Sequence, residues 1–123
     1  MTESDRSPTV EVVEADRLLR AGGEDGPILL DVREVPEFEI VRAEGARLLP
    51  LSTFLANYQR LPADRPIMVI CATGSRSGQA TAYLLAHGWS DVVNVTGGTL
   101  AWQRAGLPIR KGPLVPGEGD LGY

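Results

Sequence analysis

Residues 67–78 read Ile67-Met68-Val69-Ile70-Cys71-Ala72-Thr73-Gly74-Ser75-Arg76-Ser77-Gly78. Four apolar residues lead into a cysteine, a short loop with a glycine, and the beginning of a helical pattern. This order is typical of a buried strand, a tight turn and a helix N-terminus. In such a turn, backbone N–H groups and the positive end of the helix converge on the residue that follows the strand. The sequence therefore predicts an anion-binding loop around Cys71.

Cys71 is the candidate nucleophile of the chain. A free thiol has a pKa of about 8.5, and both a helix N-terminus and a neighbouring cation lower it, so that the reactive thiolate is populated at neutral pH. Arg76 supplies a cation five residues further on. A lone cysteine is often only a small buried apolar residue. Here the flanking loop favours the reactive interpretation.

Length and composition indicate one modest domain. The chain has 123 residues, 43% of them hydrophobic, which is enough for a single core. Sixteen acidic residues against twelve basic ones give a net charge of −4, so we expect no nucleic-acid surface. No apolar run has the length of a membrane span and residues 1–9 lack a secretory signal pattern, so we expect no membrane association. A single cysteine excludes an internal disulfide, and a reducing cytoplasm is the expected compartment.

Strand and helix patterns alternate along the chain. Strands are predicted at 9–12, 28–32, 48–49, 67–70 and 91–95, and helices at 14–21, 36–41, 53–58, 77–87 and from Gly98 to about 105. Ser52 is the predicted N-cap of the third helix. This alternation predicts an α/β fold, a three-layer arrangement with a central parallel sheet and helices on both faces. Ligands of such sheets bind beyond the carboxyl ends of the strands, where Cys71 lies.

Composition changes near both ends of the chain. We interpret residues 1–8 as a flexible N-terminus and 9–111 as the domain. Residues 112–123, rich in glycine and proline, are predicted to be a flexible tail. The alternative is that Leu114-Val115 or Tyr123 folds over the site or docks a partner.

Some polar residues are expected to support the site without reacting. Asp31 and Arg33 follow a strand end and suit an ion pair that fixes loop geometry. His87, the only histidine, precedes a helix-ending glycine and is interpreted as structural. A Cys-His general base is therefore not expected. Gly97-Gly98 is read as a tight turn between a strand and a helix.

The segment CATGSRSG resembles the active-site loop of the rhodanese-like sulfurtransferases. Three further stretches resemble that family in the same order: Leu30-Asp31-Val32-Arg33-Glu34, Gly45-Ala46 to Pro50-Leu51, and Gly97-Gly98 with Ala101-Trp102 and Ala105-Gly106-Leu107-Pro108. The resemblance covers about residues 10–111. Four pieces in order are far more specific than any one of them.

The resemblance implies a sulfurtransferase that works through a persulfide on Cys71. The sulfane sulfur would come from thiosulfate or another persulfide donor and pass to cyanide, a thiol or a protein acceptor. The substrate-binding residues would be Ala72, Thr73, Gly74, Ser75, Arg76 and Ser77. No metal site and no cofactor are expected.

Two positions depart from the family pattern. Ala72 stands where thiosulfate sulfurtransferases often carry arginine, which removes a cation and predicts a weaker use of thiosulfate. Arg42 stands where many members have the histidine of Gly-His-Ile-Pro. It is expected to support the site, either by changing the packing of its loop or by supplying a replacement cation.

Two rival functions remain open at this stage. Related folds use a cysteine loop on oxyanions, as phosphatases and arsenate reductases do. Only four residues separate Cys71 from Arg76, however, one fewer than in tyrosine-phosphatase-type loops, which favours a single sulfur atom over phosphate. The other rival is a sulfur-carrier or interaction module that receives persulfide from a protein partner.

Overall fold

A parallel sheet of five strands forms the centre of the computed structural model, which describes residues 7–122. The strand order is β1 (Thr9–Val10), β6 (Val92–Val95), β5 (Ile67–Ile70), β2 (Ile28–Asp31) and β4 (Arg47–Leu48). Every neighbouring pair is parallel. A second, antiparallel pair joins β3 (Arg42–Ala43) to β7 (Ile109–Arg110). The predicted α/β architecture with a central parallel sheet is confirmed.

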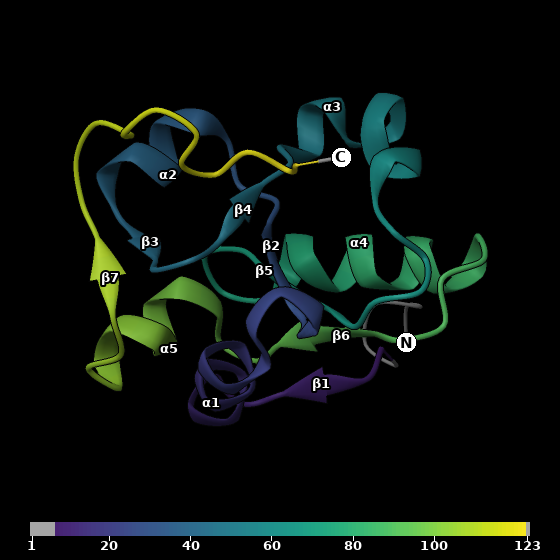
Figure 1. Ribbon diagram of the computed structural model, residues 1–123, viewed down its shortest axis with the longest axis horizontal. Helices are drawn as coiled ribbons and strands as arrows, with labels where there is room; N and C mark the ends of the chain where they lie inside the picture. The colour runs from purple at the N-terminus through teal and green to yellow at the C-terminus, as the bar shows by residue number, and fades with distance from the viewer. Residues whose placement is uncertain (1–6, 123) are drawn as a thin grey trace.

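Helices cover both faces of this sheet (Figure 1). They are α1 (Val12–Gly22), α2 (Val35–Ile40), α3 (Leu51–Asn57), α4 (Ser75–Ala86) and α5 (Gly98–Arg104), with single turns η2 (Gly23–Asp25) and η3 (Tyr58–Arg60). The helices α3 and α4 pack on one face, and α1, α2 and α5 contribute to the core on the other.

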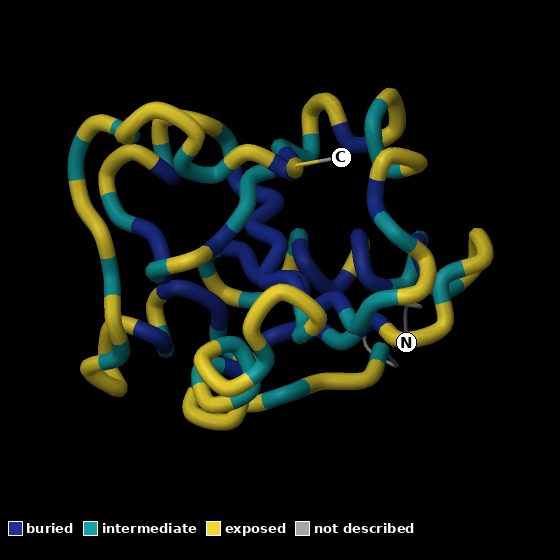
Figure 2. Tube along the Cα trace, viewed as in Figure 1, coloured by how far each residue is buried: buried dark blue, intermediate teal, exposed yellow. Residues whose placement is uncertain are grey.

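The two central strands, β2 and β5, are buried along their whole length, as the dark blue tube in Figure 2 shows. Successive side chains of a strand point to opposite faces of the sheet. Leu30 and Val69 therefore belong to the cluster under α3 and α4, whereas Leu29 and Met68 belong to the cluster with Trp102 of α5. Burial on both faces is the reason these strands show no polar alternation in the sequence.

Local boundaries differ from the predictions at several elements. The predicted strand 9–12 is shorter, since β1 ends at Val10, and α1 begins at Val12, two residues before the predicted start. The predicted N-cap at Ser52 is wrong, because α3 begins at Leu51 with Pro50 in the cap position. The Ser52 hydroxyl instead donates to Oε1 of Glu34 at 2.6 Å. Helix α4 begins at Ser75, two residues before the predicted start, because Gly74 takes the left-handed conformation (φ 108°) directly before it. Glycine adopts that conformation without the steric cost that a side chain would impose.

Strands β3 and β7 were not predicted. Each has two residues, which is too short to show a periodic pattern, and their pairing joins segments more than sixty positions apart. The antiparallel pair brings the chain after α5 back along α2. From there, residues 112–122 run past β4 toward α3, shown as the yellow segment of Figure 1.

The C-terminal segment, residues 112–122, packs against the domain, which differs from the expected mobile tail. The Leu48 amide donates to the Gly119 carbonyl at 2.7 Å, and Leu121 is 5% exposed within the hydrophobic core. Arg42 donates to the Glu118 carboxylate and, at 2.8 Å, to the Gly112 carbonyl. Composition suggested disorder because it does not show contacts between distant residues. This segment supplies Glu118 as the partner of the buried Arg42, and Leu121 as a residue of the hydrophobic core.

The ends of the chain are only partly described. Residues 1–6 and Tyr123 lie outside the described residues, and with them most of the predicted flexible N-terminus and the possible role of Tyr123. Pro8 is described, and its carbonyl accepts a hydrogen bond from the backbone N–H of Asn94 at 2.8 Å, next to the β1–β6 pairing. Between residues 7 and 122, no helix is both long and apolar enough to cross a membrane.

Candidate active site

Cys71 lies directly after β5, at the carboxyl edge of the sheet, and is 1% exposed. The loop that follows turns back over its sulfur. The Gly74 amide donates to Sγ at 3.1 Å, and the Ser77 hydroxyl lies 3.2 Å from Sγ. Both groups belong to the turn or first helical turn of α4. The sulfur is thus surrounded by donors that the strand-loop-helix geometry positions.

The surroundings of Cys71 act on the thiol pKa in opposite directions. Burial alone would raise it, because a buried thiolate loses its hydration. Hydrogen bonds from the Ser77 hydroxyl and from the backbone N–H groups of Ser77, Gly74 and Thr73 outweigh that effect and lower the pKa of Cys71 below its ordinary value. A thiolate stabilised in this way is the nucleophilic form of cysteine.

The carbonyl side of the same loop is held by the start of α5. Thr99 donates to the Cys71 carbonyl twice, from its amide at 2.8 Å and from its hydroxyl at 3.1 Å. The Leu100 amide donates to the Ala72 carbonyl at 3.1 Å. A Cβ on Gly98 would lie 2.4 Å from the Cys71 carbonyl oxygen, so only glycine permits this approach. The sequence indicated a tight turn here but not its contact with the cysteine loop.

Arg76, the expected cation of the site, is paired with Glu37 of α2. Its Nη1 and Nη2 donate to Oε1 and Oε2 of Glu37 at 2.7 and 2.8 Å. The hydrogen bond from Arg76 is the main reason that the pKa of Glu37 falls to about 2. In turn, Glu37 raises the pKa of Arg76, with smaller contributions from Cys71 and Asp31. Arg76 therefore lies within the electrostatic reach of the sulfur, but its charge is largely compensated.

Glu37 was not among the predicted site residues. Its sequence signal was a local one: Glu34 and Glu37 have capping-box spacing, and both reciprocal hydrogen bonds at the start of α2 are present. That pattern explains the helix start. It does not reveal that the same carboxylate reaches an arginine 39 positions away.

The expected ion pair between Asp31 and Arg33 is present and fully buried. Arg33 Nη2 donates to Oδ2 of Asp31 at 2.8 Å, and its backbone amide donates to Oδ1 at 2.9 Å. The remaining donors of Arg33 reach the carbonyls of Glu37 and Val41. The pair thereby joins the end of β2 to the middle of α2 and to the residue that caps its C-terminus.

The other predicted residues are placed as follows. Ala72 is half-buried, whereas Thr73 and Ser75 are exposed on the loop. The hydrogen bonds of the Arg42 side chain go to residues outside the cysteine loop. Its partners are Glu118 and the carbonyls of Phe38 and Gly112. Of the two possibilities raised by the sequence for Arg42, these contacts favour an effect on packing over a replacement cation.

Asn94 of β6 is a second site residue that the sequence analysis missed. Its Nδ2 donates to the Gly74 carbonyl at 3.0 Å, and its Oδ1 accepts from the Ser77 hydroxyl at 2.6 Å. Both partners also contact the Cys71 sulfur. The available signal was one amide in the otherwise apolar strand Val92–Val95. A polar side chain pointing into a core needs hydrogen-bond partners.

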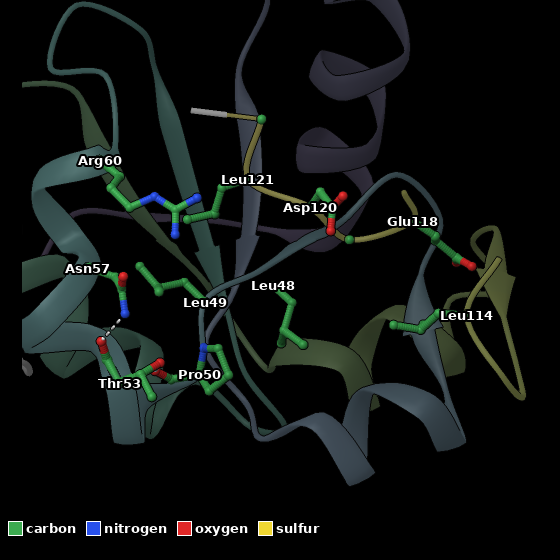
Figure 3. Close-up of a pocket in the computed structure, with 12 residues that line it drawn as sticks. Leu48, Leu49, Pro50, Thr53, Asn57, Arg60, Leu114, Glu118, Asp120 and Leu121 are labelled. Atoms are coloured by element: carbon green, nitrogen blue, oxygen red, sulfur yellow. Dashed lines mark hydrogen bonds between the residues drawn. The ribbon is translucent and has the colours of Figure 1, made fainter. Parts of the chain in front are cut away.

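A cavity of about 650 Å³ lies elsewhere, between α3 and the C-terminal segment (Figure 3). Thr53, Asn57 and Arg60 line one side, and residues 118–122 line the other. None of the predicted site residues lines it. Among residues 7–122, no group of three or more histidine, cysteine, aspartate or glutamate side chains is arranged to hold a metal ion.

A buried cysteine, held by a hydrogen-bonded loop at the carboxyl edge of a parallel sheet, defines an α/β protein with a cysteine-loop site. Comparison with known proteins narrows this class. Residues 12–105 match the rhodanese-like domain, and the chain belongs to that family.

Named relatives agree with this assignment. A sulfurtransferase of Allochromatium vinosum is 38% identical over 82 residues, which cover 67% of this chain and 77% of that protein. The thiosulfate sulfurtransferase GlpE of Actinobacillus succinogenes is 36% identical over 85 residues, covering 69% and 77%. The crystal structure of a rhodanese-related protein from Thermoplasma volcanium has a TM-score of 0.75 and 27% identity, and the match covers 84% of this chain and 97% of that one. These relatives support membership of a sulfurtransferase family.

Proposed function

We propose that this protein transfers sulfane sulfur through a persulfide on Cys71. The thiolate attacks the outer sulfur of thiosulfate, a new S–S bond forms, and sulfite leaves with the electron pair of the old S–S bond. An acceptor thiolate or cyanide then attacks the outer sulfur of the persulfide. The Cys71 thiolate leaves, and the resting state returns.

One observation carries this proposal: the Cys71 sulfur is the point on which the loop donors converge. The Gly74 amide at 3.1 Å and the Ser77 hydroxyl at 3.2 Å stabilise negative charge on Sγ. Sγ carries that charge both when it attacks the donor and when it leaves from the persulfide. Preorganised donors aimed at a developing charge lower the barrier without reorganisation.

The choice of donor depends on the charge around the loop. The GlpE relative is named a thiosulfate sulfurtransferase, which supports thiosulfate as a donor. Two features oppose strong use of this dianion: Ala72 brings no cation, and Glu37 compensates the charge of Arg76. We therefore expect a persulfide donor, with a single negative charge on its terminal sulfur, to load Cys71 faster than thiosulfate does.

The intact mass of the protein tests this function. Incubation with thiosulfate or a small persulfide is expected to add the mass of one sulfur atom, which cyanide or a reductant then removes. Cys71→Ser is the matched control, since it removes the only thiol, and it is expected to stay unmodified. An unmodified wild-type protein across both donor classes would contradict the proposal.

Turnover assays separate the rival functions. Repeated transfer to small thiols or cyanide supports the enzyme, whereas loading by a protein donor without turnover of small molecules would indicate a carrier. Hydrolysis of aryl phosphates is expected to be negligible. Cys71-dependent phosphatase turnover that exceeds sulfur transfer would replace the proposed function.

A further inference from the structure

The hydroxyl of Ser77 has two hydrogen-bond acceptors and one proton. Its Oγ lies 2.6 Å from Oδ1 of Asn94 and 3.2 Å from Sγ of Cys71, and all three side chains are buried or nearly so. A serine hydroxyl donates a single proton, although it also accepts hydrogen bonds. The proton of Ser77 therefore points either to the amide or to the sulfur at any moment.

The orientation of the Asn94 amide is fixed by the loop. Its Nδ2 lies 3.0 Å from the Gly74 carbonyl, which can only accept, so that nitrogen must occupy the donor position there. Oδ1 consequently faces Ser77 as an acceptor. The neighbouring elements β6 and α4 run side by side in Figure 1, which keeps Asn94 and Ser77 in this relation.

The protonation state of Cys71 decides which acceptor is satisfied. With a thiol, the S–H group can donate to Ser77 Oγ while Ser77 donates to Asn94. Each of these three side chains then has a hydrogen-bond partner. With a thiolate, Ser77 turns its proton toward the sulfur, and Oδ1 of Asn94 gives up that bond. A buried acceptor that loses its hydrogen bond costs free energy.

We infer that Asn94 is a positioning residue for the proposed reaction: it holds the Ser77 proton away from Cys71 while the sulfur is protonated, and releases it when negative charge forms on the sulfur. Asn94 thus opposes part of the stabilisation that the loop gives to the thiolate. Very strongly stabilised thiolates are weaker nucleophiles, and the best attacking thiol has a pKa near the ambient pH. Asn94 keeps the sulfur reactive while the loop keeps it ionisable.

Charged groups near the sulfur act in addition to this hydrogen-bond exchange. Arg76 on α4 favours the thiolate, Glu37 on α2 compensates Arg76, and the Asp31–Arg33 pair at the end of β2 is internally neutral. None of them contacts Asn94 among the described hydrogen bonds. Substitution of Asn94 by an uncharged residue therefore leaves these charges in place.

A double-mutant cycle tests the inference by titration of the thiolate absorbance, for which Cys71→Ser is the blank. Asn94→Leu, which is close in volume but cannot hydrogen-bond, is expected to lower the Cys71 pKa and raise the thiolate-to-thiol ratio about fivefold, the effect of one hydrogen bond of ordinary net strength. In a Ser77→Ala background the same substitution is expected to lower the pKa much less, because only the hydrogen bond from Asn94 Nδ2 to the Gly74 carbonyl is then lost. Equal shifts in both backgrounds, or a higher pKa in the first, would overturn the inference and leave Asn94 as a loop anchor only.

A second measurement needs no change at Asn94 and so does not depend on the folding of that variant. Cys71 is the only source of an S–H stretching band in the infrared spectrum. The wild-type band is expected at the lower frequency of a hydrogen-bonded thiol, and Ser77→Ala is expected to move it to the free-thiol position. A free-thiol band in the wild type would contradict the inference.

The inference rests on Cys71 as the proposed reacting group. Both measurements report the protonation of Cys71 and not sulfur transfer, so a failure of the proposed function is detected separately.

Discussion

Arg76 and Glu37 form a two-point ion pair beside the nucleophile, with N–O distances of 2.7 and 2.8 Å. The loop of the site thus supplies its own arginine and also receives an acidic partner from a different helix. Because the partner compensates the charge, electrostatic attraction of a dianionic donor is weaker than the sequence of the loop alone suggests. Glu37 consequently becomes the residue through which donor preference can be changed.

Substitution Glu37→Gln is expected to increase the rate of Cys71 loading by thiosulfate severalfold, because it leaves Arg76 with an uncompensated charge. Glutamine retains an oxygen that can accept the hydrogen bond from the Glu34 amide, so the start of α2 is preserved. Stopped-flow or quenched mass measurements at low salt provide the rate. Since the pKa of Glu37 is about 2, the carboxylate keeps its charge as the pH falls until the pH approaches that value, and the difference should persist across pH 5–8.

The matched control for this substitution is Glu39→Gln, which makes the same charge change at an exposed position of the same helix. It is expected to leave the loading rate nearly unchanged. If both variants accelerate loading equally, the effect is one of net charge. If Glu37→Gln slows loading, orientation of Arg76 matters more than its free charge, and our account of donor preference is wrong.

The pH dependence of loading should follow the lowered pKa of Cys71. The thiolate is present above its pKa and is lost as the pH falls through it. The midpoint of the rate profile is therefore expected below the ordinary thiol value. Ser77→Ala removes a donor to the sulfur and should move the midpoint upward, whereas Ser90→Ala, at an exposed position, should not. A Ser77→Ala profile that coincides with the wild type would show that this hydroxyl does not stabilise the thiolate.

A third prediction concerns the buried ion pair under the site. Asp31→Asn leaves Arg33 buried without its full counter-charge, and removal of one partner from a buried pair typically costs about 3–5 kcal/mol in the free energy of unfolding. Urea denaturation measures this cost. Glu14→Gln breaks the exposed pair with Arg17 and is expected to leave the free energy of unfolding nearly unchanged, because water screens that pair. Similar costs for the two variants would mean that the Asp31–Arg33 pair contributes no more than a surface contact.

Sequence reasoning succeeded where the information was local. The strand before Cys71, the glycine turn and the helix after it are contiguous, and their order is enough to place the sulfur among N–H donors. The Asp31–Arg33 pair was also accessible, because its members are two positions apart. These features depend on backbone geometry that short patterns specify.

The missing features depend on contacts between distant segments. Glu37 is explained locally as a capping residue, and Asn94 resembles an isolated polar residue in a strand, until the fold brings each to the cysteine loop. The prediction of a flexible tail for the C-terminal segment was wrong for the same reason. Glycine and proline indicate irregular structure, but an irregular segment can still pack against the domain. Only the sheet order and the path after α5 show what this segment covers.

The last prediction tests the packing of the C-terminal segment with two apolar residues of that segment. Leu121 is 5% exposed and belongs to the core, whereas Val115 is 51% exposed. Leu121→Ala is expected to destabilise the protein by about 2 kcal/mol or more, since it removes buried methyl groups and leaves a cavity. Val115→Ala is expected to change the free energy of unfolding by less than about 0.5 kcal/mol. Hydrogen exchange provides a second measurement, because the Leu48 amide is bonded to the Gly119 carbonyl and should exchange faster in the Leu121 variant. Equally small effects of both substitutions, together with rapid exchange at Leu48 in the wild type, would instead support the mobile tail that composition suggested.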